Sequence, residues 1–152
     1  MVELKLASVS LDKTSRISVL VLEEEESEAK RIILIYIAEP EAHAIDIALK
    51  NLRMPRPMTH DLMLNIVERL TGTVTAIHIN DYHGKTFYAT LKLKSDSGEY
   101  DIDSRPSDAI ALALRCDVPI YIEEALIEQH GLFASELNEN KNMVLDLDVE
   151  PL

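Results

Sequence analysis

One segment constrains the fold of this chain more than any other: an almost wholly apolar helix that follows directly on an alternating strand. Residues 109–114 read Ala-Ile-Ala-Leu-Ala-Leu, so a helix over Pro106–Arg115 has apolar side chains around most of its circumference. Such a helix is stable only when other elements cover it. Asp103, Arg105 and Asp108 lie where the strand passes into the helix. We therefore expect a central helix with polar side chains concentrated at its buried start.

Apolar residues elsewhere alternate in some segments and follow helical spacing in others. Alternation with many β-branched residues predicts strands over residues 4–11, 17–22, 32–37, 74–80, 87–94, 99–103 and 119–122. Helical spacing predicts a helix over Pro40–Leu52, a second from a capping Thr59 through Leu70, and a helical turn over 123–130. The sequence therefore predicts an α+β fold, in which a mixed, largely antiparallel sheet packs against three to four helices in a single compact domain.

The last residues of the chain carry weaker structural signals and a strong charge. Of the 27 acidic residues, eight lie in residues 123–152, where a single basic residue occurs. We treat residues 134–152 as an acidic C-terminal extension. Two forms stay open for it, a loose tail or a late strand through Val144–Val149.

The formal net charge of -12 disfavours general attraction to nucleic acid, because nucleic acid is itself a polyanion. The charge is unevenly spread, however, and the middle of the chain is close to neutral. Two windows, 47–60 and 82–95, contain several basic residues and no acid. In the second window Tyr88, Lys92 and Lys94 share one face of a predicted strand, where they suit base stacking and phosphate binding. The alternative is that these lysines are ordinary solvated surface residues.

The cysteine content and the start of the chain bear on its location. Cys116 is the single cysteine, which excludes an intramolecular disulfide and favours a reducing compartment. Residues 1–5 lack the basic and apolar regions of a signal peptide, and no apolar run reaches the roughly 18 residues of a membrane-spanning helix. We therefore expect a soluble, cytoplasmic protein with no membrane partner.

The second predicted helix starts with polar residues like those of the central helix. Arg56, His60 and Asp61 flank its first turn. A metal-assisted phosphodiesterase needs carboxylates, a base for water and cations for phosphate, and the two helix starts supply all three. The structural alternative is that the carboxylates merely favour helix N-termini and pair with the arginines. No Cys or His pair has the spacing of a zinc site, and no glycine-rich phosphate loop occurs.

Two arginine-proline motifs give the chain a recognisable pattern. The segments Arg56-Pro57-Met58-Thr59-His60-Asp61 and Asp103-Ser104-Arg105-Pro106-Ser107-Asp108, with residues 35–37, 41–45 and 87–89, resemble the bifunctional nuclease family. The resemblance covers residues 1–133, and Ala38 and Asn51 stand where the family pattern often has glycine. It implies a compact α+β domain, a homo-oligomer, most simply a homodimer, and nuclease activity on RNA and DNA.

The resemblance also selects the candidate site residues, for which we infer the roles. They are Glu41, Arg56, His60, Asp61, Asp103, Arg105 and Asp108. We expect a divalent metal, Mg²⁺ or Mn²⁺, held by Asp103 and Asp108 with Glu41. His60 would position the attacking water, with Asp61 orienting it or completing the metal shell.

Substrate contacts complete this hypothesis of a nuclease that acts on single strands of RNA or DNA. Arg56 and Arg105 would bind phosphate, and Tyr88, Lys92 and Lys94 would extend the contact along the strand. Two alternatives stay open: a non-catalytic assembly module whose acidic surface recruits a protein partner, and a site for a small anionic ligand between subunits.

Overall fold

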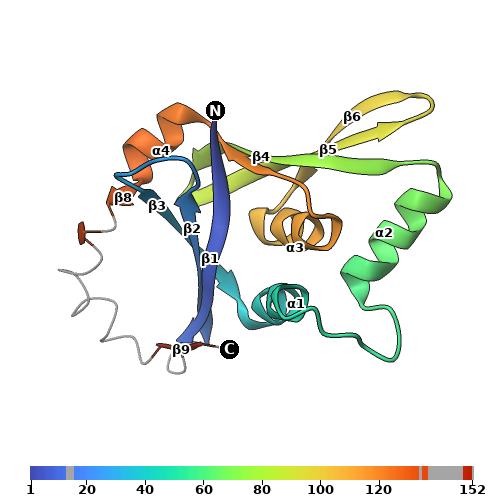
Figure 1. The fold of residues 1–152 in the computed structure, drawn as a ribbon, viewed down its shortest axis with the longest axis horizontal. Helices are drawn as coiled ribbons and strands as arrows, with labels where there is room; N and C mark the ends of the chain where they lie inside the picture. The colour runs from blue at the N-terminus through green and yellow to red at the C-terminus, as the bar shows by residue number, and fades with distance from the viewer. Residues whose placement is uncertain (13–15, 134, 137–148, 152) are drawn as a thin grey trace.

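The computed structural model describes residues 1–12, 16–133, 135–136 and 149–151. Within these ranges nine strands form one sheet in the order β6-β5-β4-β7-β1-β2-β3-β8, and β9 pairs with β1 (Figure 1). The strands are β1 (Val2–Asp12), β2 (Ile17–Glu24), β3 (Arg31–Ala38), β4 (Thr73–His83), β5 (Thr86–Ser95), β6 (Gly98–Ser104), β7 (Ile120–Ile122), β8 (Leu132–Phe133) and β9 (Val149–Pro151). Strands β4 and β7 run parallel and the other recorded pairs are antiparallel. The sheet is mixed and largely antiparallel, which confirms the predicted fold class.

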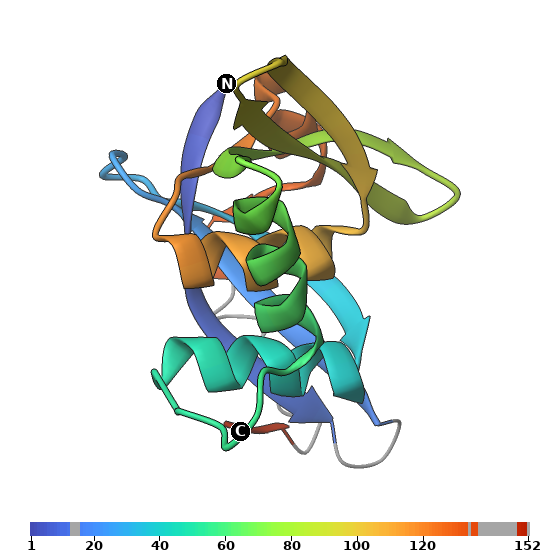
Figure 2. The same cartoon turned by 90° about the vertical axis from the view of Figure 1, so that its right-hand side faces the viewer.

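Four helices accompany this sheet in the described part: α1 (Glu39–Leu49), α2 (Thr59–Arg69), α3 (Pro106–Cys116) and α4 (Glu124–His130). Helices α1 and α3 lie on one side of strands β1–β3, and α4 lies on the other side (Figure 1). Helix α2 crosses in front of both α1 and α3 (Figure 2). Each of these helices has too little length or apolar character to cross a membrane, within the residues described.

Helix α3 is the centre of the core, as its composition predicts. All residues from Ala109 to Ala113 are buried. They pack with large buried residues of the strands and of α1, among them Leu20, Leu22, Ile33, Ile45, Ile77 and Ile79. Because the whole circumference of α3 is covered, its N-terminus is fixed in place relative to the sheet and to α1.

Helix α1 ends at Leu49, three residues before the predicted end at Leu52. The Asn51 amide donates to Ala48 O at 3.1 Å, and the Leu52 amide donates to Ile47 O at 3.0 Å. This is the Schellman pattern, which requires a left-handed residue directly after the helix. Asn51 has φ +50°, and asparagine adopts that conformation more readily than most residues. The same requirement explains why the family pattern often has glycine at this position.

Helix α2 begins one residue earlier than the sequence indicated. Thr59 was predicted as the N-cap, but it is the first helical residue and Met58 is the cap. The Met58 amide donates to Asp61 Oδ2 at 2.9 Å. The prediction was wrong because the carboxylate in the first turn, rather than the threonine hydroxyl, binds the backbone at the helix start.

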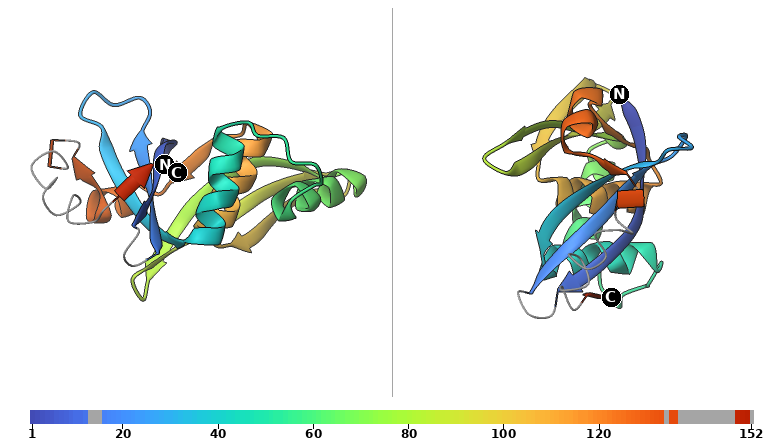
Figure 3. Two further views of the ribbon diagram at one scale, coloured as in Figure 1. Left: turned by 90° about the horizontal axis from the view of Figure 1, so that it is seen from below. Right: turned by 90° about the vertical axis from the view of Figure 1, so that its left-hand side faces the viewer.

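The β4–β5 hairpin projects beyond the rest of the sheet (Figure 3). Its turn consists of Gly84 and Lys85, with φ +57° and +63°. Positive φ at both central residues defines a type I′ turn, whose twist matches that of the flanking strands. Residues of this hairpin line one pocket with the ends of β3 and β6.

The C-terminal extension is described only in part. Of the predicted late strand over Val144–Val149, residues 144–148 lie outside the described residues. Strand β9 begins at Val149 and pairs antiparallel with β1, in the register Ser10 opposite Pro151. The boundary predicted between residues 133 and 134 stays a prediction.

Candidate active site

Four side chains from three helices form one connected cluster at the start of α3. Arg105 Nε donates to Asp108 Oδ2 at 2.7 Å, and Arg105 NH1 lies 3.0 Å from Glu41 Oε1 on α1. His60 Nε2, from the first turn of α2, lies 3.0 Å from Asp108 Oδ1. The two helix starts that the sequence pointed to therefore meet through the His60–Asp108 contact.

His60 is the buried end of this cluster. His60 as a whole is only 7% exposed to solvent. Because a carboxylate only accepts hydrogen bonds, the proton on His60 Nε2 faces Asp108. The imidazole therefore supports Asp108 from behind, away from solvent. We had predicted that His60 positions water, and in this geometry any effect on a water acts through Asp108.

Asp108 is held in its charged form. Burial by itself would raise the pKa of this carboxyl group, but the hydrogen bonds from Arg105 and His60 outweigh burial and lower the pKa. The same contact raises the pKa of Arg105, with Asp108 as the main cause and Glu41 as a smaller one. The ion pair is thus present throughout the neutral pH range.

Arg105 is the exposed end of the cluster. Its side chain is 64% exposed, although two carboxylates hold it. A guanidinium group has five N–H donors, and the contacts recorded in the described part use two of them. The remaining donors are available to a ligand, and the fork geometry of the group suits a phosphate oxygen pair.

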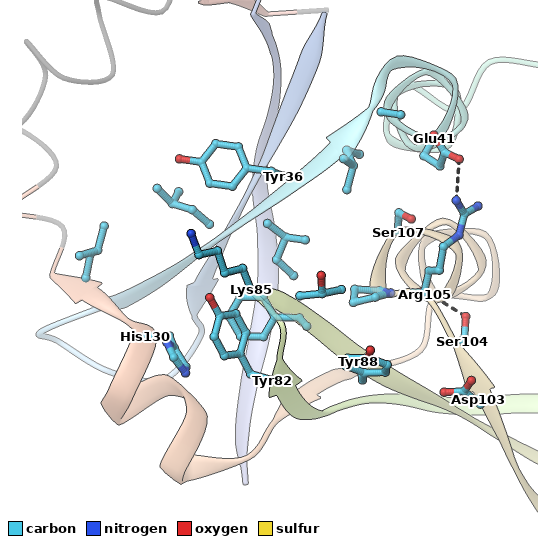
Figure 4. Close-up of a pocket in the computed structure, with 18 residues that line it drawn as sticks. Tyr36, Glu41, Tyr82, Lys85, Tyr88, Asp103, Ser104, Arg105, Ser107 and His130 are labelled. Atoms are coloured by element: carbon cyan, nitrogen blue, oxygen red, sulfur yellow. Dashed lines mark hydrogen bonds and ion pairs between the residues drawn. The ribbon is translucent and has the colours of Figure 1, made fainter. Parts of the chain in front are cut away.

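Arg105 lies on the rim of a pocket of about 670 Å³ between β3, the β4–β5 hairpin and the start of α3 (Figure 4). The lining combines aromatic and charged side chains: Tyr36, Tyr82, Phe87, Tyr88, His130, Lys85, Arg105, Glu41 and Asp103. Its volume lies within the range of roughly 300–1,000 Å³ typical of small-molecule sites. Glu41 also places a buried oxygen, Oε2, at this site, without a hydrogen-bond partner among the described residues.

Of the predicted site residues, some line this pocket and others do not. Tyr88 and Asp103 line it. Lys92 and Lys94 lie on β5 outside the lining, and Lys92 Nζ donates to Asp101 Oδ2 at 2.7 Å. Arg56 is exposed in the connection between α1 and α2, also outside the lining. The structure thus joins Arg105, Asp103 and Tyr88 at one pocket and leaves the other three residues elsewhere on the surface.

Asp61 belongs to a second ion pair, which is structural in character. Arg115 Nε donates to Asp61 Oδ1 at 2.7 Å, and its other nitrogens donate to Ala111 O at 2.8 Å and Ala44 O at 3.1 Å. Arg115 therefore ties α1, α2 and α3 together. Burial would raise the pKa of Asp61, yet Arg115 and the Met58 amide lower it.

The carboxylates predicted as metal ligands do not form a ready metal site. Both oxygens of Asp108 are engaged by His60 and Arg105, and Glu41 Oε1 is engaged by Arg105. Within the described ranges, no group of three His, Cys, Asp or Glu side chains is placed to hold a metal ion. The residues in this arrangement do not fit a metal held by three protein ligands, and we derive no catalytic step through one.

Tyr36, Tyr82 and His130 are lining residues that the sequence reasoning missed. They come from β3, β4 and the end of α4, which only the folded sheet brings together. A partial signal existed for Lys85, since it belongs to the acid-free window 82–95. No local pattern marks the others, because isolated tyrosines on strands are usual core or surface residues.

The chain is similar to known proteins over most of its length. The model of the bifunctional nuclease domain matches residues 20–135. An uncharacterized protein of Mycobacterium tuberculosis is 33% identical over 139 residues, which make up 91% of this chain and 82% of that protein. Bifunctional nuclease 1 of Oryza sativa is 29% identical over 104 residues, covering 66% of this chain and 31% of the plant protein. Bifunctional nuclease 2 of Arabidopsis thaliana is 28% identical over 106 residues, covering 66% and 32%. The chain spans about a third of the length of these plant relatives.

Proposed function

This chain belongs to the bifunctional nuclease domain family, and on that premise we propose that it hydrolyses phosphodiester bonds in single strands of RNA and DNA. The observation that carries the proposal is the exposed guanidinium of Arg105, fixed by two carboxylates at the rim of an aromatic pocket. Phosphodiester hydrolysis places extra negative charge on the phosphoryl oxygens, and a preorganised arginine stabilises that charge.

Each residue of the cluster has a role in this proposal. Arg105 binds the scissile phosphate, while Glu41 and Asp108 hold its guanidinium in one orientation. His60 fixes Asp108 from the buried side. Holding a charged group in place before the reaction removes the cost of reorganising it during the reaction.

The charge of the cluster gives a reason for the divalent cation that we predicted. Glu41 and Asp108 carry two negative charges against the positive charge of Arg105, and the pocket adds one more carboxylate, Asp103, and one more cation, Lys85, so that negative charge is in surplus. A phosphate enters such a site more readily when a further cation offsets the surplus charge. Dependence on Mg²⁺ or Mn²⁺ stays a prediction, with Asp103 and the unpartnered Glu41 Oε2 as the donors to examine.

Cleavage of labelled single-stranded RNA and DNA tests the proposal. We would compare the wild type with Asp108→Asn, each in Mg²⁺, Mn²⁺ or chelator. Asp96→Asn is the matched control, because it makes the same charge change at an exposed turn outside the pocket. We expect cleavage to be lost in Asp108→Asn and retained in Asp96→Asn. Equal cleavage by all three proteins would mean that the activity has another source.

The predicted homo-oligomer is supported by the outer face of α2. Four apolar side chains are exposed there: Leu62, Met63, Ile66 and Leu70. A cluster of this kind on a small domain is a candidate contact surface. We expect a second copy of the chain to cover it, so that light scattering gives at least twice the mass of 17.1 kDa. A monomeric mass for the wild type would contradict this part of the proposal.

We expect the protein to act in the cytoplasm, as its single cysteine suggests.

A further inference from the structure

We propose that the pocket beside Arg105 is a nucleobase subsite, in which Tyr36 and the ring cluster of Tyr82, Phe87 and His130 stack one unpaired base. Arg105 and Lys85 then bind the phosphates on either side of that base. This inference rests on the proposed function, because it names the part of a polynucleotide that the same site recognises.

One wall of the pocket is an aromatic cluster that is already assembled. The rings of Tyr82 and His130 lie 3.9 Å apart, and those of Tyr82 and Phe87 lie 4.6 Å apart. These contacts fix the three rings relative to one another, so that little side-chain entropy is lost when a planar ligand binds. A fixed aromatic surface open to a pocket is the usual platform for an unpaired base.

The opposite wall contributes Tyr36 on β3. Tyr36 is 63% exposed, whereas Ile35 before it is buried in the core. Figure 4 shows Tyr36 on one side of the pocket and Tyr82 and Lys85 on the other. A base between these walls would cover the exposed ring of Tyr36.

Lys85 is kept at the hairpin tip in a backbone conformation that disfavours it. Its φ of +63° is one that glycine or asparagine adopts at lower cost. The lysine therefore gives no benefit to the turn itself. Its ammonium group lies at the pocket, as does Arg105 on the other rim. Two cations at one aromatic pocket match a nucleotide with a phosphate on each side.

Ser107 supplies a polar contact inside the pocket. Its residue is 5% exposed and lines the pocket at the start of α3. Its hydroxyl group can donate one hydrogen bond and accept others, so it is available to a polar atom of a bound base or sugar. The double helix cannot offer a base in this way, because its bases are stacked and paired. The subsite therefore selects flexible single strands.

The test is a binding measurement in chelator, without cleavage. The probes are a labelled twelve-nucleotide oligothymidylate and an oligomer of the same length made of abasic nucleotides, which has the phosphates but no bases. The variants are Tyr36→Ala and the matched control Tyr100→Ala, which removes an exposed tyrosine of β6 outside the pocket. We expect the wild type and Tyr100→Ala to bind the thymidylate roughly 5- to 150-fold more tightly than the abasic oligomer. We expect Tyr36→Ala to lose most of that difference.

Two further measurements test the nucleobase subsite. The chain has five tyrosines and no tryptophan, so its intrinsic fluorescence comes from tyrosine. The thymidylate should quench this fluorescence by stacking on the pocket tyrosines, whereas the abasic oligomer should not. Lys85→Gly should weaken binding of both oligomers while leaving the melting temperature equal or higher. Equal affinity for the two oligomers, or an equal loss in Tyr36→Ala and Tyr100→Ala, would overturn the subsite. Thymidine monophosphate that binds as tightly as the oligomer would overturn the polynucleotide as its ligand.

The outcome is separate from that of the proposed function. Base-dependent binding without any cleavage would retain the subsite and contradict the nuclease. Cleavage by a protein that does not distinguish the two oligomers would retain the nuclease and contradict the subsite.

Discussion

Two arginine–aspartate pairs at the ends of α3 have the same nitrogen–oxygen distance but differ in how far the arginine is exposed to solvent. Arg105 Nε and Arg115 Nε each lie 2.7 Å from an aspartate oxygen. The Arg115 side chain is 8% exposed and also binds two backbone carbonyls, whereas the Arg105 side chain is 64% exposed at a pocket. Burial, rather than the pair itself, separates an arginine that holds helices together from one that can receive a ligand.

The largest effect on stability is expected for Arg115→Ala. The substitution leaves Asp61 without its partner and removes the contacts that join α1, α2 and α3. Hydrogen bonds to a charged group contribute about 1.5–3 kcal/mol each to the unfolding free energy, and the substitution removes three that the buried arginine makes. Arg105→Ala is the matched control, for which we expect less than about 1 kcal/mol because the Arg105 side chain is exposed to water and Asp108 keeps its contact with His60. Urea unfolding measures both, and equal losses would show that the two pairs do not differ in role.

The second prediction concerns how the stability contributed by Asp108 changes as the pH is lowered. The folded pKa of Asp108 is lowered below the ordinary carboxyl value of about 4, because Arg105 and His60 outweigh burial. A group with a lowered folded pKa stabilises the fold fully above its unfolded pKa and loses that effect as the pH falls through the folded value. Unfolding experiments should therefore show Asp108→Asn about 1–3 kcal/mol less stable than wild type at pH 7. This difference should shrink as the pH falls below the ordinary carboxyl value of about 4, and a difference independent of pH would contradict the charged pair.

His60 is a positioning residue in this structure, and His60→Gln tests that role. Glutamine keeps a donor near Asp108 but does not fill the imidazole site. If His60 only orients Asp108, cleavage should fall roughly tenfold through kcat, while KM and the pH profile of kcat keep their form. A kcat profile that changes its form in His60→Gln would instead assign His60 a direct proton transfer.

Much of the fold was predictable because it depends on local patterns. The period of apolar residues located all four helices, and turn residues located the β4–β5 and β5–β6 hairpins. Strand β8 escaped prediction because two residues carry no periodic signal. The α1 end at Leu49 escaped because Asn51 acts through its backbone conformation rather than through hydrophobicity.

The candidate site was predictable only where its residues are close in sequence. Arg105 and Asp108 are three apart at a helix start, which places them on one face. Glu41 came from the family resemblance and His60 from the start of the second predicted helix, and no spacing rule joins either of them to α3. The Asp61–Arg115 pair spans 54 residues and depends on how α2 crosses α3. Sequence spacing cannot supply such a crossing.

The smallest effects are expected for Lys92 and Lys94 on the outer face of β5. Each should change the unfolding free energy by less than about 0.5 kcal/mol when replaced by alanine. If this face binds the polynucleotide as predicted, each substitution should reduce the slope of log affinity against log salt by about one. An unchanged slope would restrict the contact to the pocket and its rim.

We propose that Arg105 is required for cleavage but not for stability. Cleavage by Arg105→Ala tests this requirement, with the melting temperature measured on the same preparation. We expect cleavage of single-stranded RNA and DNA to fall at least roughly a hundredfold relative to wild type. The melting temperature should stay within a few degrees, about what a loss of less than 1 kcal/mol produces in a domain of this size. Cleavage at the wild-type rate by a folded Arg105→Ala protein would contradict the proposed site.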